Sequence, residues 1–200
     1  MLAIDIDDTL TDTALRVIER AHQLFGHALS AAELRNKFLQ PGNVPQWQGV
    51  EVQNEIKTIL ESREFLFELE PKLGSANQLY EANKSYPISC YITSRSSEFQ
   101  EVTQAWLTKH HFPQAPLVTR PVVESRQEWK LRYLRENFPK ITFLVDDVMV
   151  PQIQHYPEIQ LLWLTSSQEQ VKLLPKNVVI LKSLAELSKT LASLEKRLEP

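Results

Sequence analysis

Short runs of apolar, often β-branched residues alternate with amphipathic stretches along most of the chain. The apolar runs predict buried strands at Leu2–Ile6, Ile88–Thr93, Pro116–Val118, Ile141–Val145, Ile159–Leu164 and Val178–Leu181. Helical periodicity lies between them, near Ser75–Lys84, Ser97–Lys109, Ser125–Asn137, Gln168–Leu174 and Ser183–Leu198. This alternation predicts an α/β fold, a doubly wound and mainly parallel sheet whose ligands bind at the carboxyl ends of the strands.

The alternation is interrupted once, by about sixty residues that read as helix throughout. A helix is predicted over Thr13–Phe25 with Gly26 as its stop, and another over Val50–Arg63, whereas Glu64–Leu69 is ambiguous. We therefore expect an α/β core formed by residues 1–12 and 72–200, with a helical insertion over residues 13–71. Ser-x-x-Glu capping boxes are predicted to begin helices at Ser30/Glu33, Ser125/Glu128 and Ser183/Glu186.

Composition narrows the functional class. The 200 residues carry 22 basic and 25 acidic side chains, a net charge of −3, so no basic footprint for a nucleic acid polymer is present. No apolar run approaches a membrane span, and the single cysteine, Cys90, excludes a disulfide framework, so we expect a cytoplasmic protein. Only four glycines occur, and their spacing excludes a dinucleotide fingerprint and a Walker phosphate loop.

All short carboxylates of the chain fall in two clusters. Only six of the 25 acids are aspartates, namely Asp5, Asp7, Asp8, Asp12, Asp146 and Asp147. Asp5 follows a predicted strand and Asp7 comes two residues later, so both side chains can lie on the same side of the chain as it leaves the sheet. In such a pair one carboxylate can attack while the other delivers a proton. For Asp12 we favour a helix N-cap.

The second cluster, Asp146 and Asp147, also follows an apolar run. By itself, an Asp-Asp pair at a strand end is as typical of a turn as of metal binding. In a parallel sheet it can meet the first cluster, and an all-oxygen, acid-rich site suits Mg²⁺, which completes its coordination with water and substrate phosphate.

Three further residues are candidates for phosphate binding. Thr93 ends a predicted strand and Ser94 follows it, ahead of a predicted helix, where a hydroxyl and backbone N–H groups can hold a phosphate oxygen. An ordinary helix-capping segment explains the same residues. Lys130, early in the next predicted helix, could reach the same strand ends, although a lone helical lysine is usually solvated.

Taken in order, Asp5-x-Asp7-x-Thr9, strand-end Thr93, Lys130 and Asp146-Asp147 resemble the four motifs of the haloacid dehalogenase-like phosphohydrolases. The resemblance spans nearly the whole chain, and the helical insertion lies where that family places its type 1 cap. The segment Glu64–Ala76 is similar to the cap-to-core return of the deoxyribonucleotidase-type 5′-nucleotidases.

The resemblance implies a Mg²⁺-dependent phosphomonoesterase, nucleotidase-like, acting on a small phosphorylated substrate. It implies that Asp5 is the nucleophile and that Asp7 protonates the leaving oxygen and then activates water. It further implies that Thr93, Ser94 and Lys130 bind the phosphoryl group. The metal would be held by Asp5, the Asp7 main-chain carbonyl and one of Asp146 and Asp147. Phe38, Trp47, Phe65 and Phe67 are candidates to stack on a base.

Three alternatives remain open. The closest is a phosphatase of a sugar phosphate or another small metabolite, which would differ only in the helical insertion. A non-catalytic phosphate-binding module is another, although receiver domains place the phosphorylated aspartate in a later strand. A glycosyltransferase also uses Asp-x-Asp but needs a larger nucleotide-sugar domain.

Overall fold

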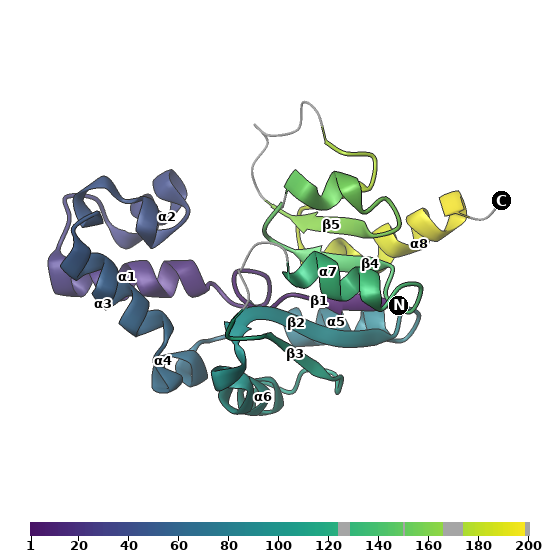
Figure 1. Ribbon diagram of the computed structural model, residues 1–200, viewed down its shortest axis with the longest axis horizontal. Helices are drawn as coiled ribbons and strands as arrows, with labels where there is room; N and C mark the ends of the chain where they lie inside the picture. Colours follow the sequence, from purple (N-terminus) through teal and green to yellow (C-terminus); the bar gives the residue numbers. More distant parts are fainter. Residues whose placement is uncertain (124–128, 150, 166–173, 199–200) are drawn as a thin grey trace.

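The computed structural model describes residues 1–123, 129–149, 151–165 and 174–198. Its centre is a parallel sheet with the strand order β3-β2-β1-β4-β5-β6 (Figure 1). The strands are β1 Leu2–Ile4, β2 Ile88–Ser96, β3 Leu117–Arg120, β4 Phe143–Asp146, β5 Gln160–Leu164 and β6 Val178–Leu181. The predicted α/β class and each of the six predicted strands are confirmed, with small shifts of their ends.

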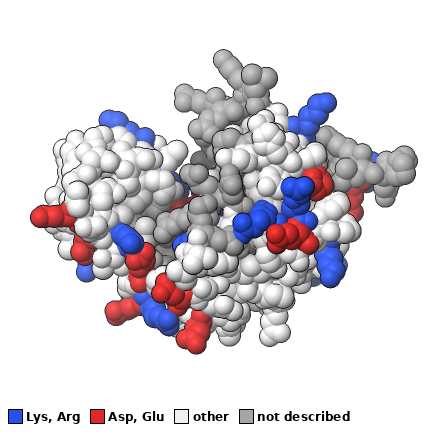
Figure 2. All heavy atoms as spheres, viewed as in Figure 1, with Lys and Arg blue, Asp and Glu red and all other residues white. Residues whose placement is uncertain are grey.

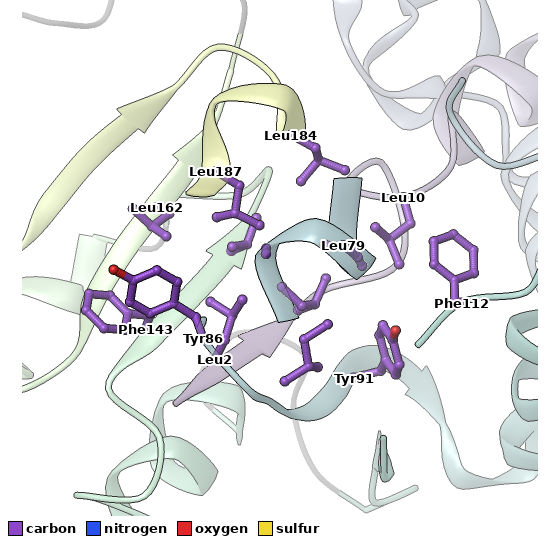
Figure 3. Packing of buried hydrophobic residues seen from close by; sticks show 14 of the residues in the cluster. Leu2, Leu10, Leu79, Tyr86, Tyr91, Phe112, Phe143, Leu162, Leu184 and Leu187 are labelled. Carbon is purple, nitrogen blue, oxygen red and sulfur yellow. The ribbon is translucent and has the colours of Figure 1, made fainter. Parts of the chain in front are cut away.

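Side-chain alternation along each strand gives the sheet two apolar faces. Leu2 and Ile4 enter one hydrophobic cluster, whereas Ala3 between them enters another. The first cluster is closed by α5 (Ser75–Asn83), α6 (Gln100–Lys109) and α8 (Leu187–Leu198), and Figure 3 shows its leucines and aromatic rings meeting. The second is closed by α7 (Trp129–Glu136) and by the 3-10 helix η4 (Pro151–His155). Helices therefore cover both faces of the sheet.

Helices α1–α4 form a separate block beside the sheet, toward the carboxyl ends of the strands (Figure 1). Their bounds are α1 Thr13–Phe25, α2 Ala31–Phe38, α3 Val50–Leu60 and α4 Arg63–Glu68, with the 3-10 turns η1 Pro41–Asn43 and η2 Pro45–Trp47 between α2 and α3. The block has its own apolar cluster, centred on the fully buried Val17, Ile18 and Trp47. The ambiguous stretch after Arg63 is thus a short helix. Gly26, at φ 68°, ends α1 as predicted.

The chain enters and leaves this block through two adjacent connections. Thr11 pairs with Pro71 in an antiparallel bridge, and the Lys72 N–H donates to the Leu10 carbonyl over 2.7 Å. The expected domain boundaries at residues 12 and 72 coincide with this paired crossing, and we propose them as the boundaries of the insertion.

The predicted capping boxes have different outcomes. The Ser30/Glu33 box is formed, with both reciprocal hydrogen bonds present. The Ser183/Glu186 box is wrong: Ser183 precedes the 3-10 helix η6 (Leu184–Glu186) without a side-chain cap, and the Glu186 carboxylate accepts from the Lys182 N–H instead. Ser125 and Glu128 lie outside the described residues, as does the predicted helix over 168–174 except its last residue.

Charge is spread over the surface. Basic and acidic side chains are interspersed on the face shown in Figure 2. Among the described helices, none combines the length and apolar character that crossing a bilayer requires.

Leu79 tests the packing of the core. This α5 side chain is fully buried beneath the sheet, so Leu79→Ala should lower the free energy of unfolding by about 2–5 kcal/mol, measured by urea denaturation. Leu73→Ala is the matched control, because Leu73 is 99% exposed and its change should stay within about 0.5 kcal/mol. Equal effects of the two substitutions would contradict this packing.

Candidate active site

The carboxyl ends of the three central strands meet at a cavity of about 270 Å³. Asp5 directly follows β1 and is held against β4, because its N–H donates to the Val145 carbonyl over 2.9 Å. Asp146 ends β4, and Ser94 lies near the end of β2. The parallel arrangement therefore brings residues more than 140 positions apart to one edge of the sheet.

A cluster of three carboxylates lines this cavity. One oxygen each from Asp5, Asp146 and Asp147 lies within 4.8 Å of the others. Lys130 reaches this cluster from the first turn of α7, with Nζ 2.5 Å from Asp5 Oδ1 and 2.8 Å from Asp146 Oδ2. The lysine predicted from sequence thus lies at the predicted strand ends.

Burial perturbs the protonation of this cluster. It raises the pKa of Asp5 to about 7, with Lys130 opposing and Asp146 and Asp7 reinforcing the shift. It also raises the pKa of Asp147 to about 9, together with repulsion from Asp5 and Asp146. Burial acts to lower the pKa of Lys130, but Asp146 and Asp5 outweigh it, so the pKa lies above its ordinary value. One ammonium group does not offset three ionised carboxylates, so without a cation Asp147 stays protonated at neutral pH.

The donor set suits a divalent cation. Three mutually close carboxylate oxygens in a buried setting, with their negative charge incompletely offset, match the oxygen ligands that Mg²⁺ takes. The Asp7 carboxylate lies outside this cluster and is turned toward Arg95. The metal role that the family resemblance implies for Asp7 is that of its main-chain carbonyl and does not require its carboxylate in the cluster.

Asp7 faces the cavity beside the cluster and is surrounded by donors. Arg95 donates to both of its oxygens, from Nη2 to Oδ1 at 2.7 Å and from Nε to Oδ2 at 2.9 Å. Thr13 adds a hydroxyl donor to Oδ1 at 2.7 Å. Burial acts to raise the pKa of Asp7, but Arg95 and Thr13 outweigh it and the pKa is lowered. Sequence reasoning assigned no role to Arg95.

Thr93 and Ser94 occupy different positions at the site. The Thr93 side chain is fully buried, donating to Asp7 Oδ2 at 3.3 Å and accepting from the Arg95 N–H at 3.2 Å. Ser94 borders the cavity itself. Ser94 is therefore the residue of this pair that borders the cavity, whereas Thr93 lies behind it and contacts Asp7.

Asp8 joins the helical block to the sheet, a role that the sequence did not indicate. Its Oδ1 accepts from the Ala14 N–H at 3.0 Å, so Asp8 caps α1. Arg35 and Gln40 of the block also donate to it, at 3.2 and 3.5 Å. The predicted N-cap, Asp12, occupies the cap position but accepts no capping hydrogen bond and pairs with Lys72 at 3.6 Å.

The aromatic residues suggested as base-stacking candidates do not border the cavity. Trp47 is buried in the core of the helical block, and Phe38 and Phe65 pack against that core. Phe67 lies under the Lys109 ammonium group, 4.7 Å from its ring centre. The aromatic ring at the cavity is Phe99, with the aliphatic residues Val17, Pro41, Leu60 and Leu66 of the helical block.

Comparison with solved structures identifies the fold. The sequence matches no protein-family model and no curated protein. A haloacid dehalogenase-superfamily hydrolase, subfamily IA, variant 1, from Geobacter sulfurreducens has a TM-score of 0.57 and 17% identity, covering 94% of this chain and 97% of that one. A protein provisionally described as a phosphatase, from Clostridium difficile, gives 0.63 and 13%, with 95% and 97% coverage. A Thermotoga maritima protein provisionally described as a β-phosphoglucomutase gives 0.61 and 20%, with 96% and 98% coverage. The chain thus has a haloacid dehalogenase-like α/β fold.

Asp147 should make the metal-free protein less stable as pH rises. Its pKa lies near 9 when folded, above the ordinary value of 3.8, so the folded state binds more protons between those pH values. The free energy of unfolding must then fall as pH rises through this window. Urea midpoints measured in chelator at pH 5, 7 and 9 should decline more steeply for the wild type than for Asp147→Asn. Glu51→Gln, at an exposed site on α3, is the control and should follow the wild type. Parallel slopes for wild type and Asp147→Asn would contradict the assignment.

Proposed function

We propose that the protein is a Mg²⁺-dependent phosphomonoesterase that acts through an aspartyl-phosphate. The observation that carries this proposal is the meeting of Asp5, Lys130 and the Asp146–Asp147 pair at one cavity, with Asp7 beside them. A fold shared with hydrolases supports it. A non-catalytic phosphate-binding module has no need of a second, separately held carboxylate next to the first.

The proposed reaction has two steps, in which Asp5 is first phosphorylated and then released by water. An Asp5 carboxylate oxygen attacks phosphorus, the bond from phosphorus to the ester oxygen breaks, and Asp7 gives its proton to that leaving oxygen. Asp7 then takes a proton from water, whose oxygen attacks phosphorus and releases Asp5 with inorganic phosphate. Asp7 is ionised in the free protein because Arg95 and Thr13 lower its pKa, so the proton that it gives in the first step must come from the substrate monoanion; in the second step it takes a proton from water.

Lys130 and Ser94 are assigned to the phosphoryl oxygens. Lys130 lies 2.5 Å from Asp5 Oδ1, so its charge is placed to attract the phosphoryl group toward the nucleophile. The Ser94 hydroxyl borders the cavity, and Thr93 lies behind it. Asp5, the Asp7 carbonyl and Asp146 or Asp147 would hold Mg²⁺, which when bound offsets the repulsion between phosphate and carboxylates.

Residues 13–71 are assigned the role of a cap that covers the site and selects the substrate. Val17, Pro41, Leu60 and Leu66 of this block border the cavity opposite the strand ends. An apolar cover keeps bulk water away from the site, which strengthens the electrostatic interactions at the reacting phosphorus. The contacts of Arg35 and Gln40 with Asp8 fasten this cover to the sheet.

The family resemblance implies a nucleotidase-like specificity, but the structure favours a different substrate class. The small cavity favours a sugar phosphate or another compact metabolite over a nucleotide as the substrate. The four aromatic residues considered for base stacking also lie away from the cavity, namely Phe38, Trp47, Phe65 and Phe67. The similarity to a protein provisionally described as a β-phosphoglucomutase points the same way. We propose a compact phosphomonoester as the substrate and keep nucleoside monophosphates as the second candidate.

Asp5→Asn should lower phosphate release from para-nitrophenyl phosphate with Mg²⁺ by roughly a thousand-fold or more, because the amide is no nucleophile. The matched control is Asp12→Asn, the same change at an exposed carboxylate paired with Lys72, which should retain wild-type activity. Retained activity in Asp5→Asn would show that another residue attacks phosphorus. No release by the wild type from any phosphomonoester would contradict the enzymatic function itself.

The substrate proposal predicts an order of preference. With wild-type enzyme and Mg²⁺, kcat/KM for hexose and triose phosphates should exceed kcat/KM for dUMP, dTMP and AMP by about ten-fold or more, since a base gains no aromatic stacking partner beyond Phe99. A coupled assay of inorganic phosphate release measures both sets. A preference for the nucleotides would favour the nucleotidase alternative.

A further inference from the structure

Arg95 is the most completely buried cation at the cavity. It lies in β2, two residues after Thr93, and its side chain is only 5% exposed although it borders the cavity. Its third nitrogen, Nη1, donates to Thr103 Oγ1 on α6 at 3.2 Å, and Thr103 is itself fully buried. The guanidinium is therefore fixed from behind by a helix while its other two nitrogens face Asp7.

The hydrogen bonds to Asp7 fill its acceptor capacity. A carboxylate offers about four lone-pair positions, two on each oxygen. Oδ1 accepts from Arg95 Nη2 and from the Thr13 hydroxyl, both at 2.7 Å. Oδ2 accepts from Arg95 Nε at 2.9 Å and from the Thr93 hydroxyl at 3.3 Å. No position is left for a leaving oxygen or a water molecule unless one donor withdraws.

Thr93 is the donor best placed to withdraw. Its contact, at 3.3 Å, is the longest of the four and therefore the weakest hydrogen bond to Asp7. When the Thr93 hydroxyl turns away from Asp7, one lone pair of Oδ2 becomes available to hold or to take a proton. The two bonds from Arg95 still hold the carboxylate plane, so the released lone pair keeps a fixed direction.

We infer that Arg95 is a positioning residue for Asp7, whose two-nitrogen fork fixes the plane of this carboxylate so that the lone pair released by Thr93 has one defined direction for proton exchange with the reacting oxygen. The inference rests on the proposed function, in which Asp7 exchanges a proton with the leaving group and with water. A lysine would not replace Arg95, because an ammonium is a point charge and cannot bind both oxygens in one plane.

The experiment compares Arg95→Gln and Arg95→Lys with the wild type, using para-nitrophenyl phosphate and Mg²⁺. Arg16→Gln is the matched control, because Arg16 is half-exposed on α1 and pairs only with the neighbouring Glu19. Each variant is measured for kcat, for the competitive inhibition constant of inorganic phosphate, and for its thermal unfolding midpoint. Thr103→Val is added because it removes the contact with α6 and keeps the fork on Asp7.

A loss of positioning should appear in kcat and not in phosphate binding. We expect Arg95→Gln to lower kcat by about a hundred-fold, with the phosphate inhibition constant changed by less than about three-fold. Arg95→Lys should recover less than about a tenth of wild-type kcat, because the charge returns without the fork. Arg16→Gln should match the wild type, and Thr103→Val should lower kcat by no more than a few-fold.

Several results would overturn the inference. Unchanged kcat in Arg95→Gln, with an active wild type and an inactive Asp5→Asn, would refute the positioning role and leave the proposed function standing. A parallel weakening of phosphate inhibition would make Arg95 a substrate ligand. Full recovery of kcat in Arg95→Lys would show that the charge alone matters. A fall in kcat for Thr103→Val as large as that for Arg95→Gln would make the role of Arg95 structural. If the wild type released no phosphate from any ester, the proposed function and this inference would fail together.

Discussion

Repulsion among three buried carboxylates is the constraint on which this site depends. Two like charges about 4 Å apart repel by about 4 kcal/mol at an effective dielectric constant of about 20. Asp5, Asp146 and Asp147 gather within such distances, and Lys130 is the ammonium that contacts two of them. A fold that retains this arrangement is less stable without a cation than with one. A divalent cation bound to these carboxylates would relieve the same repulsion.

Arg95 gives Asp7 an electrostatic environment that differs from that of the carboxylate cluster. Asp7 has partners of its own, Arg95 and Thr13, which outweigh burial and lower its pKa, whereas burial raises the pKa of Asp5. Two carboxylates only two residues apart thus have unlike environments. Environments that push the pKa values of paired carboxylates apart are typical of sites in which the two groups have different roles.

The sequence predicted those features of the fold and site that follow from local rules. Asp5 and Asp146 could be placed together because the carboxyl ends of adjacent parallel strands share one edge, and the helical block was visible from its periodicity. Arg95 and Asp8 were not predicted to contact other elements, since their partners are distant in sequence: 88 residues separate Arg95 from Asp7, and 27 separate Asp8 from Arg35. The direction of an aromatic ring in the helical block depends on how the helices rotate against each other, which a pattern does not fix. The cytoplasmic location remains a prediction.

The central claim is that Asp5 becomes phosphorylated during turnover, and identifying the phosphorylated residue tests it most directly. The wild type would be mixed with para-nitrophenyl phosphate and Mg²⁺, quenched in acid within the first turnover, digested, and analysed by mass spectrometry. If Asp5 is the nucleophile, a phosphoryl group is expected on Asp5, in the peptide that contains this residue. A phosphoryl group on any other residue, or turnover without a phosphorylated protein, would contradict it.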